Sequence, residues 1–461
     1  MMAGRGKNVL FISLEDANPW FGCYGHHQVS TPNMDEIASR GTVFRYAYAQ
    51  AAVCNPSRAS LIMGLRPGTT GVFGNFDDWR NRIPEATGTI PEHFHANGYR
   101  TVNIGKVVHS WENYRPTHPN GAARVEAMWE THLPNPEGDE PILEPKRPAA
   151  PAPDEFREWD GINFVESSLN WGSTGLGAEQ HADTRRARAA AQCLREHAGG
   201  DDARPLFLSI GFASAHYSFR PPAEFAARYS AETTTLPHYP PGDLDDVPVV
   251  YPPFNTTDGI RMTNEETKQL IAAYQACISY VDFCVGVLTE ALEAAGIADQ
   301  TVICLWTDHG LHMGEHGLWR KETLFEEASH VPLIIADPDR GPAVTDRLVE
   351  LVDVYPTLCD VCDLPAPDGL EGTSAAPLMD DPNRPWKKAV FTHVRRGTHN
   401  VTVRTDEWRY SEWGDSRRRE LYDLENDPLE ITNLAYDPAY AAVRREMQGV
   451  LAGGWRGARP E

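Results

Sequence analysis

Four apolar segments along the chain have the pattern of buried β-strands. They are NVLFISL from residue 8, TVNIG from residue 101, PLFLSIGF from residue 205 and TVICLWT from residue 301. Amphipathic stretches between these segments predict helices over residues 35–40, 181–197 and 265–295. Because strands alternate with helices, we expect an α/β fold with a large, central, mostly parallel sheet flanked by helices on both faces.

The pattern changes after residue 382. Four short segments with strand-like alternation, KKAVFTHV, HNVTVRT, EWRYSEW and RELYDL, precede a last amphipathic helix that begins at about residue 438. Short alternating segments are typical of antiparallel sheets with one face exposed. We therefore expect a large domain over residues 1–382 and a smaller C-terminal subdomain of antiparallel strands and one helix over residues 383–461.

Composition and net charge limit the kinds of molecule that this protein is expected to bind. The 461 residues are 41% apolar, which is enough for a large core. The 65 acidic residues against 42 basic ones give a formal net charge of -23, so we expect no nucleic acid and no anionic membrane as partner. The N-terminal sequence MMAGRGKNVLFISLED has the pattern of a strand, not of a signal peptide, and no apolar run is long enough to span a bilayer. These features predict a cytoplasmic location.

The eight cysteines lack the spacing of a disulfide framework or of a metal cluster. Several lie within apolar segments, which predicts reduced and buried thiols. Cys359 and Cys362 form a single CxxC motif, and we expect these two thiols to share one turn of a helix.

Polar side chains follow each of the four predicted strands. In chain order they are Glu15 and Asp16, then Lys106 and His109, then His216, and then Asp308 and His309. Ligands of open α/β sheets bind beyond the carboxyl ends of the strands, so four distant segments can deliver these side chains to one edge. Acids around a cation, with lysine and histidine beside them, make a site for an anion.

The segment AVCNPSRAS combines a cysteine with the signals that start a helix. Asn55 is a good N-cap and Pro56 suits the first helical position, which would place Cys54 just outside the helix. Helix N-termini favour negative charge, and Arg58 can reach the same space. The alternative is that Cys54 is a small buried residue and that Arg58 is a surface charge.

The residues Cys54-Asn55-Pro56-Ser57-Arg58 resemble the Cys-x-Pro-Ser-Arg signature of the type I, formylglycine-dependent sulfatases. The resemblance extends in the same order to LEDANPWFGCYG, GKVVH, AHYSFRPPAEF, TDHGLHMGEHGLWRKETLFEEASHVPLI and ELYDLENDPLEITNL, and is nearest to iduronate-2-sulfatase-like bacterial members. It covers the chain from Asn8 to about Asn433. It implies an alkaline-phosphatase-like fold, one divalent metal ion, and a maturation enzyme that oxidises Cys54 to formylglycine. Calcium is the expected metal, with magnesium or manganese as alternatives.

The resemblance also implies roles for individual residues. The implied metal ligands are Glu15, Asp16, Cys54, Asp308 and His309. Glu15 stands where the family commonly has an aspartate, so its direct ligation stays open. The implied catalytic residues are Cys54 as the nucleophile precursor, Arg58 as its stabiliser, Lys106 and Lys321 at the sulfuryl group, and His109 and His216 as the acid and base in either assignment.

The function that the resemblance implies is hydrolysis of a sulfate ester. The substrate would be a small sulfated sugar, an oligosaccharide, or an aryl or alkyl sulfate. Two alternatives stay open: a phosphonate monoester or phosphodiester hydrolase of the same superfamily, and a non-catalytic, sulfatase-like binding protein. The expected specificity loops, around residues 73–85, 110–180 and 235–258, carry no readable code for the organic part of the substrate, and the oligomeric state is not encoded in any recognisable pattern.

Overall fold

The computed structural model describes most of the chain. The described residues are 6–109, 127–134, 169–249, 262–396 and 398–460, with positions 143, 146, 158, 159, 162, 163, 251, 256 and 260 between them. Much of the expected specificity loop over residues 110–180, and part of the loop over residues 235–258, lies outside the described residues.

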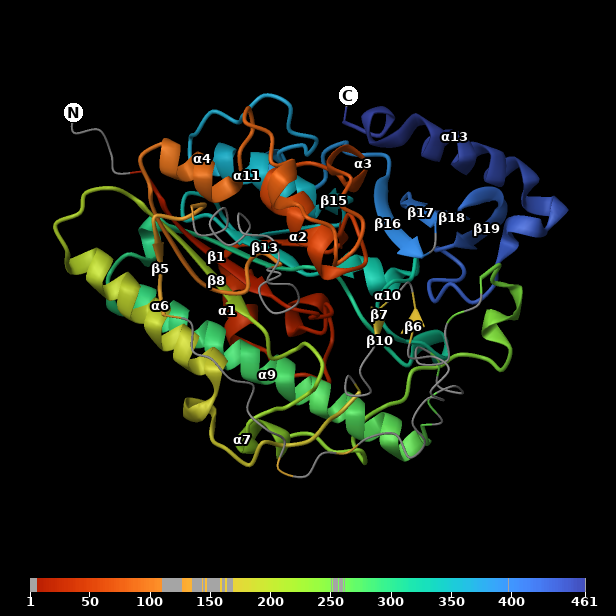
Figure 1. Cartoon of the computed structure of the whole chain (residues 1–461), viewed down its shortest axis with the longest axis horizontal. Helices are drawn as coiled ribbons and strands as arrows, with labels where there is room; N and C mark the ends of the chain where they lie inside the picture. The colour runs from red at the N-terminus through yellow and green to blue at the C-terminus, as the bar shows by residue number, and fades with distance from the viewer. Residues whose placement is uncertain are drawn as a thin grey trace.

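An eight-stranded sheet forms the centre of the molecule (Figure 1). Its strand order is β14-β2-β13-β9-β1-β8-β4-β5. The bounds are β1 Asn8–Leu14, β2 Thr42–Phe44, β4 Arg100–Gly105, β5 Thr131–His132, β8 Leu206–Phe212, β9 Thr301–Thr307, β13 Leu333–Ala336 and β14 Ala343–Thr345. β13 runs antiparallel to both of its neighbours, and the other neighbouring pairs are parallel. The predicted mostly parallel sheet is therefore confirmed.

Helices cover both faces of this sheet. On one face lie α1 (Pro32–Arg40), α6 (Ala182–Gly199) and α9 (Asn264–Ala294), and on the other lie α2 (Cys54–Met63), α4 (Ile90–Ala96) and α11 (Val354–Val361). Figure 1 shows α6 and α9 below the sheet and α2, α4 and α11 above it. Each of the three predicted helices is confirmed to within a few residues. Cys359 and Cys362 lie in and directly after α11, as expected, and both are buried.

The longest helix, α9, passes through the core. Its start is capped by Thr263, whose Oγ1 accepts a hydrogen bond from the Glu266 backbone N–H at 3.2 Å. Among the described residues, α9 is the one helix whose length and composition would suit a membrane span, and 89% of its apolar window is buried inside the protein. Its apolar character is therefore accounted for by packing against β-strands and helices.

The C-terminal region has its own sheet and core. Strands β16 (Val390–Arg396), β17 (Thr398–Arg404), β18 (Trp408–Trp413) and β19 (Asp415–Asp423) pair antiparallel in sequence order. Helix α13 (Ala441–Gly457) packs on them through Met447. It begins three residues after the predicted start because Pro438–Tyr440 forms a separate 3-10 turn. We propose residue 382 as the boundary between this subdomain and the large domain.

The C-terminal sheet is joined to the segment that precedes Cys54. The His393 backbone N–H donates to the Gln50 carbonyl at 2.9 Å, and the Ala52 N–H donates to the His393 carbonyl at 3.2 Å. In addition, the buried Lys387 ammonium lies 2.8 Å from Glu350 Oε2 and 2.7 Å from Asp353 Oδ1. The subdomain thus supports the chain on which residue 54 is carried.

The Lys387 ion pairs predict a large loss of stability when the ammonium is removed. In Lys387→Met two carboxylates stay buried without this partner, and breaking a buried ion pair in this way costs about 3 to 5 kcal/mol. We expect the free energy of unfolding, measured by urea denaturation, to fall by about 3 kcal/mol or more. The matched control is Lys388→Met, because Lys388 is exposed and exposed charges contribute little to stability. Equal stability of the two variants would contradict the prediction.

Candidate functional site

The carboxyl ends of β1, β8 and β9 lie level with one another. Leu14, the last residue of β1, pairs with Phe212 of β8 on one side and with Thr307 of β9 on the other. The residues that follow these three strands therefore start from the same edge of the sheet. β4 reaches this edge through a close approach of two backbones, since a Cβ atom at Gly211 would overlap the Lys106 carbonyl group. The prediction that four segments converge on one edge agrees with this geometry.

Cys54 is the first residue of α2, and here the predicted helix start is wrong by two residues. The helix begins at Cys54 with Val53 as its N-cap, so Cys54 lies inside the helix and not just outside it. Asn55 does not act as the cap because its side-chain amide donates to the Gly74 carbonyl at 2.9 Å and to the Asp77 carbonyl at 2.8 Å. The shift keeps Cys54 at the N-terminus of the helix, where negative charge is favoured.

Four buried side chains, one of which is Cys54, surround one point. The ligand atoms of Asp16, Cys54, Asp308 and His309 all lie within 4.8 Å of one another. Cys54 Sγ lies 3.3 Å from His309 Nε2 and 4.0 Å from Asp16 Oδ1. His309 Nδ1 lies 2.9 Å from the Gly310 carbonyl, to which it donates, so in the neutral ring Nε2 carries the lone pair on the side of the cluster. Two carboxylates, an imidazole and residue 54 are a donor set that fits a divalent cation.

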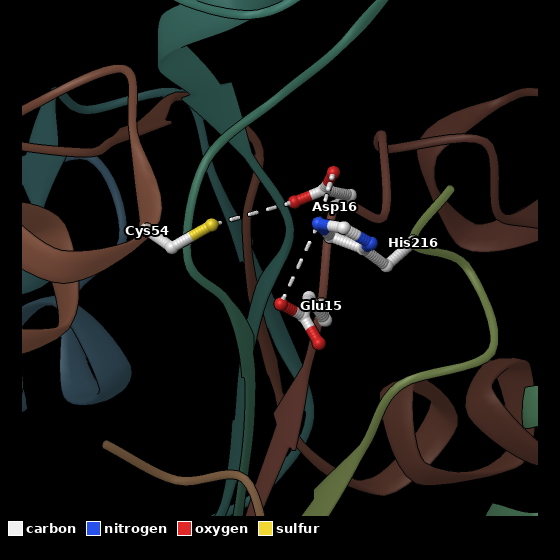
Figure 2. A group of neighbouring side chains, drawn as sticks. All are labelled: Glu15, Asp16, Cys54 and His216. Atoms are coloured by element: carbon white, nitrogen blue, oxygen red, sulfur yellow. Dashed lines mark hydrogen bonds and ion pairs between the residues drawn. The ribbon is translucent and has the colours of Figure 1, made fainter. Parts of the chain in front are cut away.

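Glu15 belongs to a second, overlapping group with Asp16, Cys54 and His216, again with ligand atoms within 4.8 Å of one another. Figure 2 shows the two carboxylates and the His216 ring facing the Cys54 sulfur. His216 Nε2 lies 3.9 Å from Glu15 Oε1 and 3.8 Å from Asp16 Oδ2. Glu15 also accepts a hydrogen bond from Lys106. Although burial raises the pKa of Glu15, Lys106 and His216 lower it to about 2, so the carboxylate is ionised.

The Lys321 ammonium group also reaches the cluster. It lies 3.0 Å from Asp16 Oδ1, 3.0 Å from Cys54 Sγ and 3.3 Å from His309 Nε2. Burial lowers the pKa of Lys321, but the Asp16 carboxylate and Cys54 raise it well above its ordinary value. Burial likewise raises the pKa of the Cys54 thiol, whereas Lys321 and Lys106 lower it well below its ordinary value. Residue 54 therefore lies in a locally positive environment within an acidic protein.

Arg58 lies beneath the cluster and is fully buried. Its Nε donates to Asp308 Oδ2 at 2.8 Å, and its Nη1 donates to the Ser13 hydroxyl at 2.8 Å and to the Lys106 carbonyl at 2.8 Å. The surface-charge alternative for Arg58 is therefore wrong. The guanidinium group orients Asp308 and neutralises it from below, which leaves the upper side of the carboxylate to the cluster.

His109 lies on the Lys106 side of residue 54. Burial lowers the pKa of its ring, although a hydrogen bond with Cys54 acts in the opposite direction. The Trp79 indole N–H donates to the His109 carbonyl at 3.1 Å and holds this segment in place. His109 and His216 thus lie in different environments, because two carboxylates overcome the effect of burial at His216 and raise its pKa.

Two polar residues that support the site were not predicted. Asn18 and Tyr274 contact the turn at Asp16, and both are buried. Asn18 lies in the quoted segment LEDANPWFGCYG but was assigned no role there, and Tyr274 is 258 positions away from Asp16 in the chain. These two residues could have been identified only from knowledge of which distant segments of the chain contact each other.

Comparisons with known proteins give one consistent result. The sequence model of the family described as Sulfatase matches residues 7–364, and the one described as N-sulphoglucosamine sulphohydrolase, C-terminal, matches residues 314–453. A sulfatase of Formosa agariphila is 31% identical, with 96% of this chain and 86% of that protein covered. The iduronate 2-sulfatase of Homo sapiens is 28% identical, with 93% of this chain and 91% of that protein covered.

Solved structures agree in fold. The phosphonate monoester hydrolase of Agrobacterium radiobacter superposes with a TM-score of 0.77 at 21% identity, over 98% of this chain and 95% of that one. At this identity the likeness shows the alkaline-phosphatase-like fold alone. The family match over most of the chain and the 31% identical relative go further. They show that this chain belongs to the sulfatase family of sulfuric ester hydrolases.

Proposed function

We propose that this protein hydrolyses sulfate esters, with a formylglycine made from Cys54 as the nucleophile and a divalent cation bound beside it. The observation that carries the proposal is the position of Cys54 at the N-terminus of α2, within one cluster with Asp16, Asp308 and His309. In the described structure the Cys54 sulfur stands in for the oxygen atoms of the hydrated aldehyde. This arrangement supports a nucleophile that is held against a cation and next to positive charge.

The cation would be held by Asp16, Asp308, His309 and residue 54. Glu15 lies in the overlapping group, and its hydrogen bond from Lys106 supports a role at the rim of the site, either as a direct ligand or as the partner of Lys106. The oxygen-rich donor set suits calcium, and magnesium or manganese would also be accepted. When bound, the cation would lower the pKa of the formylglycine hydroxyl and polarise the sulfate group.

Lys106 and Lys321 are proposed to bind the sulfuryl oxygens. Their ammonium groups flank residue 54, and their side chains keep 28% and 14% of their surface exposed, so a substrate can reach both. Positive charge aimed at an anion within a dry site stabilises the charge that develops in the transition state. With Arg58 beneath Asp308, these residues supply the local positive charge that an acidic protein needs to receive an anion.

We propose that each of the two histidines carries out one of the two proton transfers of the reaction. His216 is 37% exposed, and the neighbouring carboxylates raise its pKa, which supports its role as the acid that protonates the leaving oxygen. His109 is half-buried with a lowered pKa, and its ring interacts with Cys54, which supports its role as the base that takes the proton from the second hydroxyl. Opposite environments at two titratable groups thus favour one of the two assignments that the sequence left open.

The names of the relatives support a proposal for the substrate class. Several relatives are named as sulfatases of sugars or of aryl sulfates, such as iduronate 2-sulfatase and arylsulfatase. We infer a small sulfated sugar, oligosaccharide or aryl or alkyl sulfate as substrate, and a formylglycine-generating enzyme as maturation partner. A cytoplasmic location stays a prediction. The non-catalytic alternative is not favoured, because Cys54, Lys106, His216 and Lys321 surround one cluster with their polar atoms directed to it.

One prediction of the proposed function concerns residue 54 and the metal. We expect the mass of the peptide that contains residue 54 to show conversion of cysteine to formylglycine, and the protein to release sulfate from an aryl sulfate. Removal of the divalent cation with a chelator should abolish sulfate release, and calcium should restore it. Cys54→Ala should be inactive, because it removes the nucleophile while leaving the metal-binding carboxylates in place. Cys193→Ala, in the buried face of α6, is the matched control and should stay active.

The same assay separates the alternatives. Full conversion of residue 54 without sulfate release, but with cleavage of a phosphonate monoester or a phosphodiester, would replace the sulfatase proposal with the other hydrolase activity of the superfamily. Full conversion with bound calcium and without turnover of any of these esters would support the binding protein.

Another prediction of the proposed function concerns the pH dependence that His216 imposes. A general acid must be protonated, and the pKa of His216 is raised above 6.5, so kcat/KM should be maintained below the raised pKa and fall as the pH rises through it. His216→Gln should lower kcat/KM on the order of a hundredfold or more and remove this alkaline limb. His95→Gln, on the exposed surface of α4, should leave the profile unchanged. An unchanged alkaline limb in His216→Gln would exclude His216 as the acid.

A further inference from the structure

The turn that follows β1 has an unusual backbone at Asp16. Its φ angle of 54° lies in the left-handed region, which residues other than glycine adopt only where the surroundings determine the conformation. The Asp16 side chain is fully buried, and its Oδ1 lies 3.2 Å from His309 Nε2. Whatever holds this turn therefore also decides where the Asp16 carboxylate points.

The hydroxyl group of Tyr274 bridges the two ends of this turn. It donates to the Asp16 carbonyl at 2.8 Å and accepts from the Asn18 backbone N–H at 2.8 Å. Tyr274 is fully buried in α9, the long helix of the core, and its ring packs on Phe219 with a centroid distance of 5.0 Å. A rigid helix thus supplies a fixed donor and acceptor to the turn.

Asn18 extends the same support to the segment that follows β9. Its Nδ2 donates to the Leu311 carbonyl at 2.8 Å, and its Oδ1 accepts from the Leu311 N–H at 2.7 Å. Leu311 lies two positions after His309. The segment after β1 and the segment after β9, which carry the two halves of the cluster, are therefore tied to each other as well as to α9.

We propose that Tyr274 is a positioning residue of the cation site, whose hydroxyl holds Asp16 in its left-handed conformation and so aims the carboxylate at residue 54 and His309. The proposal rests on the proposed function, because it assigns Tyr274 to the binding of the catalytic cation. In this role Tyr274 does not contact the reacting atoms. It acts through the geometry of Asp16, as residues that orient metal ligands do.

Tyr274→Phe is the variant that tests this role. It keeps the ring in the core and removes both hydrogen bonds to the turn. Because partners that orient metal ligands contribute strongly to affinity, we expect the Kd for calcium to rise on the order of tenfold. We expect kcat to fall at limiting calcium and to recover at saturating calcium, with KM for the sulfate ester unchanged. A purely structural role would not give recovery by calcium.

Tyr280→Phe is the matched control. Tyr280 lies on the same helix, is equally buried, and its hydroxyl accepts a hydrogen bond from the Thr184 N–H at 2.9 Å, away from the cluster. The two variants remove the same atom from the same kind of environment. Tyr280→Phe should keep the wild-type Kd for calcium even if its melting temperature falls as far as that of Tyr274→Phe.

The measurements use the full chain with residue 54 converted. Calcium binding is followed by titration calorimetry, and hydrogen exchange of the peptide that contains Asn18 is followed by mass spectrometry. We expect faster exchange of the Asn18 amide in Tyr274→Phe than in Tyr280→Phe. Wild-type calcium affinity together with unchanged exchange in a folded Tyr274→Phe would overturn the proposal.

Asn18→Ala provides a second variant if Tyr274→Phe does not fold. It loosens the same turn from the β9 side and should weaken calcium binding in the same direction, so wild-type affinity here would overturn the positioning account. Failure of the proposed function gives a different result. In that case the wild-type protein itself would bind no divalent cation, whereas the exchange of the Asn18 amide would still decide whether Tyr274 holds the turn.

Discussion

Three carboxylates, those of Glu15, Asp16 and Asp308, are buried together at one edge of the central sheet. Burying a charge is costly unless a partner of opposite charge and hydrogen bonds compensate for it, and three like charges at one place increase that cost. The arrangement of the site follows from this constraint. Arg58 neutralises Asp308 from below, Lys106 pairs with Glu15, and Lys321 lies against Asp16. A bound cation would complete the same compensation.

The positively charged side chains of the site differ in their exposure to solvent. The buried one supports the structure of the site, whereas the partly exposed ones are open to a substrate. Arg58 is fully buried and uses its donors on Asp308 and on backbone carbonyls, so its charge is fixed in the body of the protein. The ammonium groups of Lys106 and Lys321 sit on flexible stems at the open side of the cluster. A protein with a net charge of -23 can therefore present a small positive site to an anion while the rest of its surface repels it.

The fold was largely predictable because its signals are local. The four buried strands read as apolar runs, α6 and α9 read as amphipathic stretches, and the antiparallel C-terminal strands read as alternation. The errors arose where a residue's partner is distant in the chain. Asn55 has the residue type of an N-cap, but its amide binds the carbonyls of Gly74 and Asp77, so the helix starts at Cys54. The antiparallel direction of β13 also depends on pairing that the strand itself does not encode.

By itself the sequence determined the fold class and predicted which residues meet at the site, since acids, histidines, lysines and the cysteine follow recognisable strands and motifs. Only the tertiary structure decided which of these charged groups lie next to one another. It placed Arg58 beneath Asp308, gave His109 and His216 opposite pKa shifts, and tied Asp16 to Tyr274 of α9. The physical reason is that the strength of an electrostatic interaction depends on separation and burial, and both are set by contacts between segments that lie far apart in the chain.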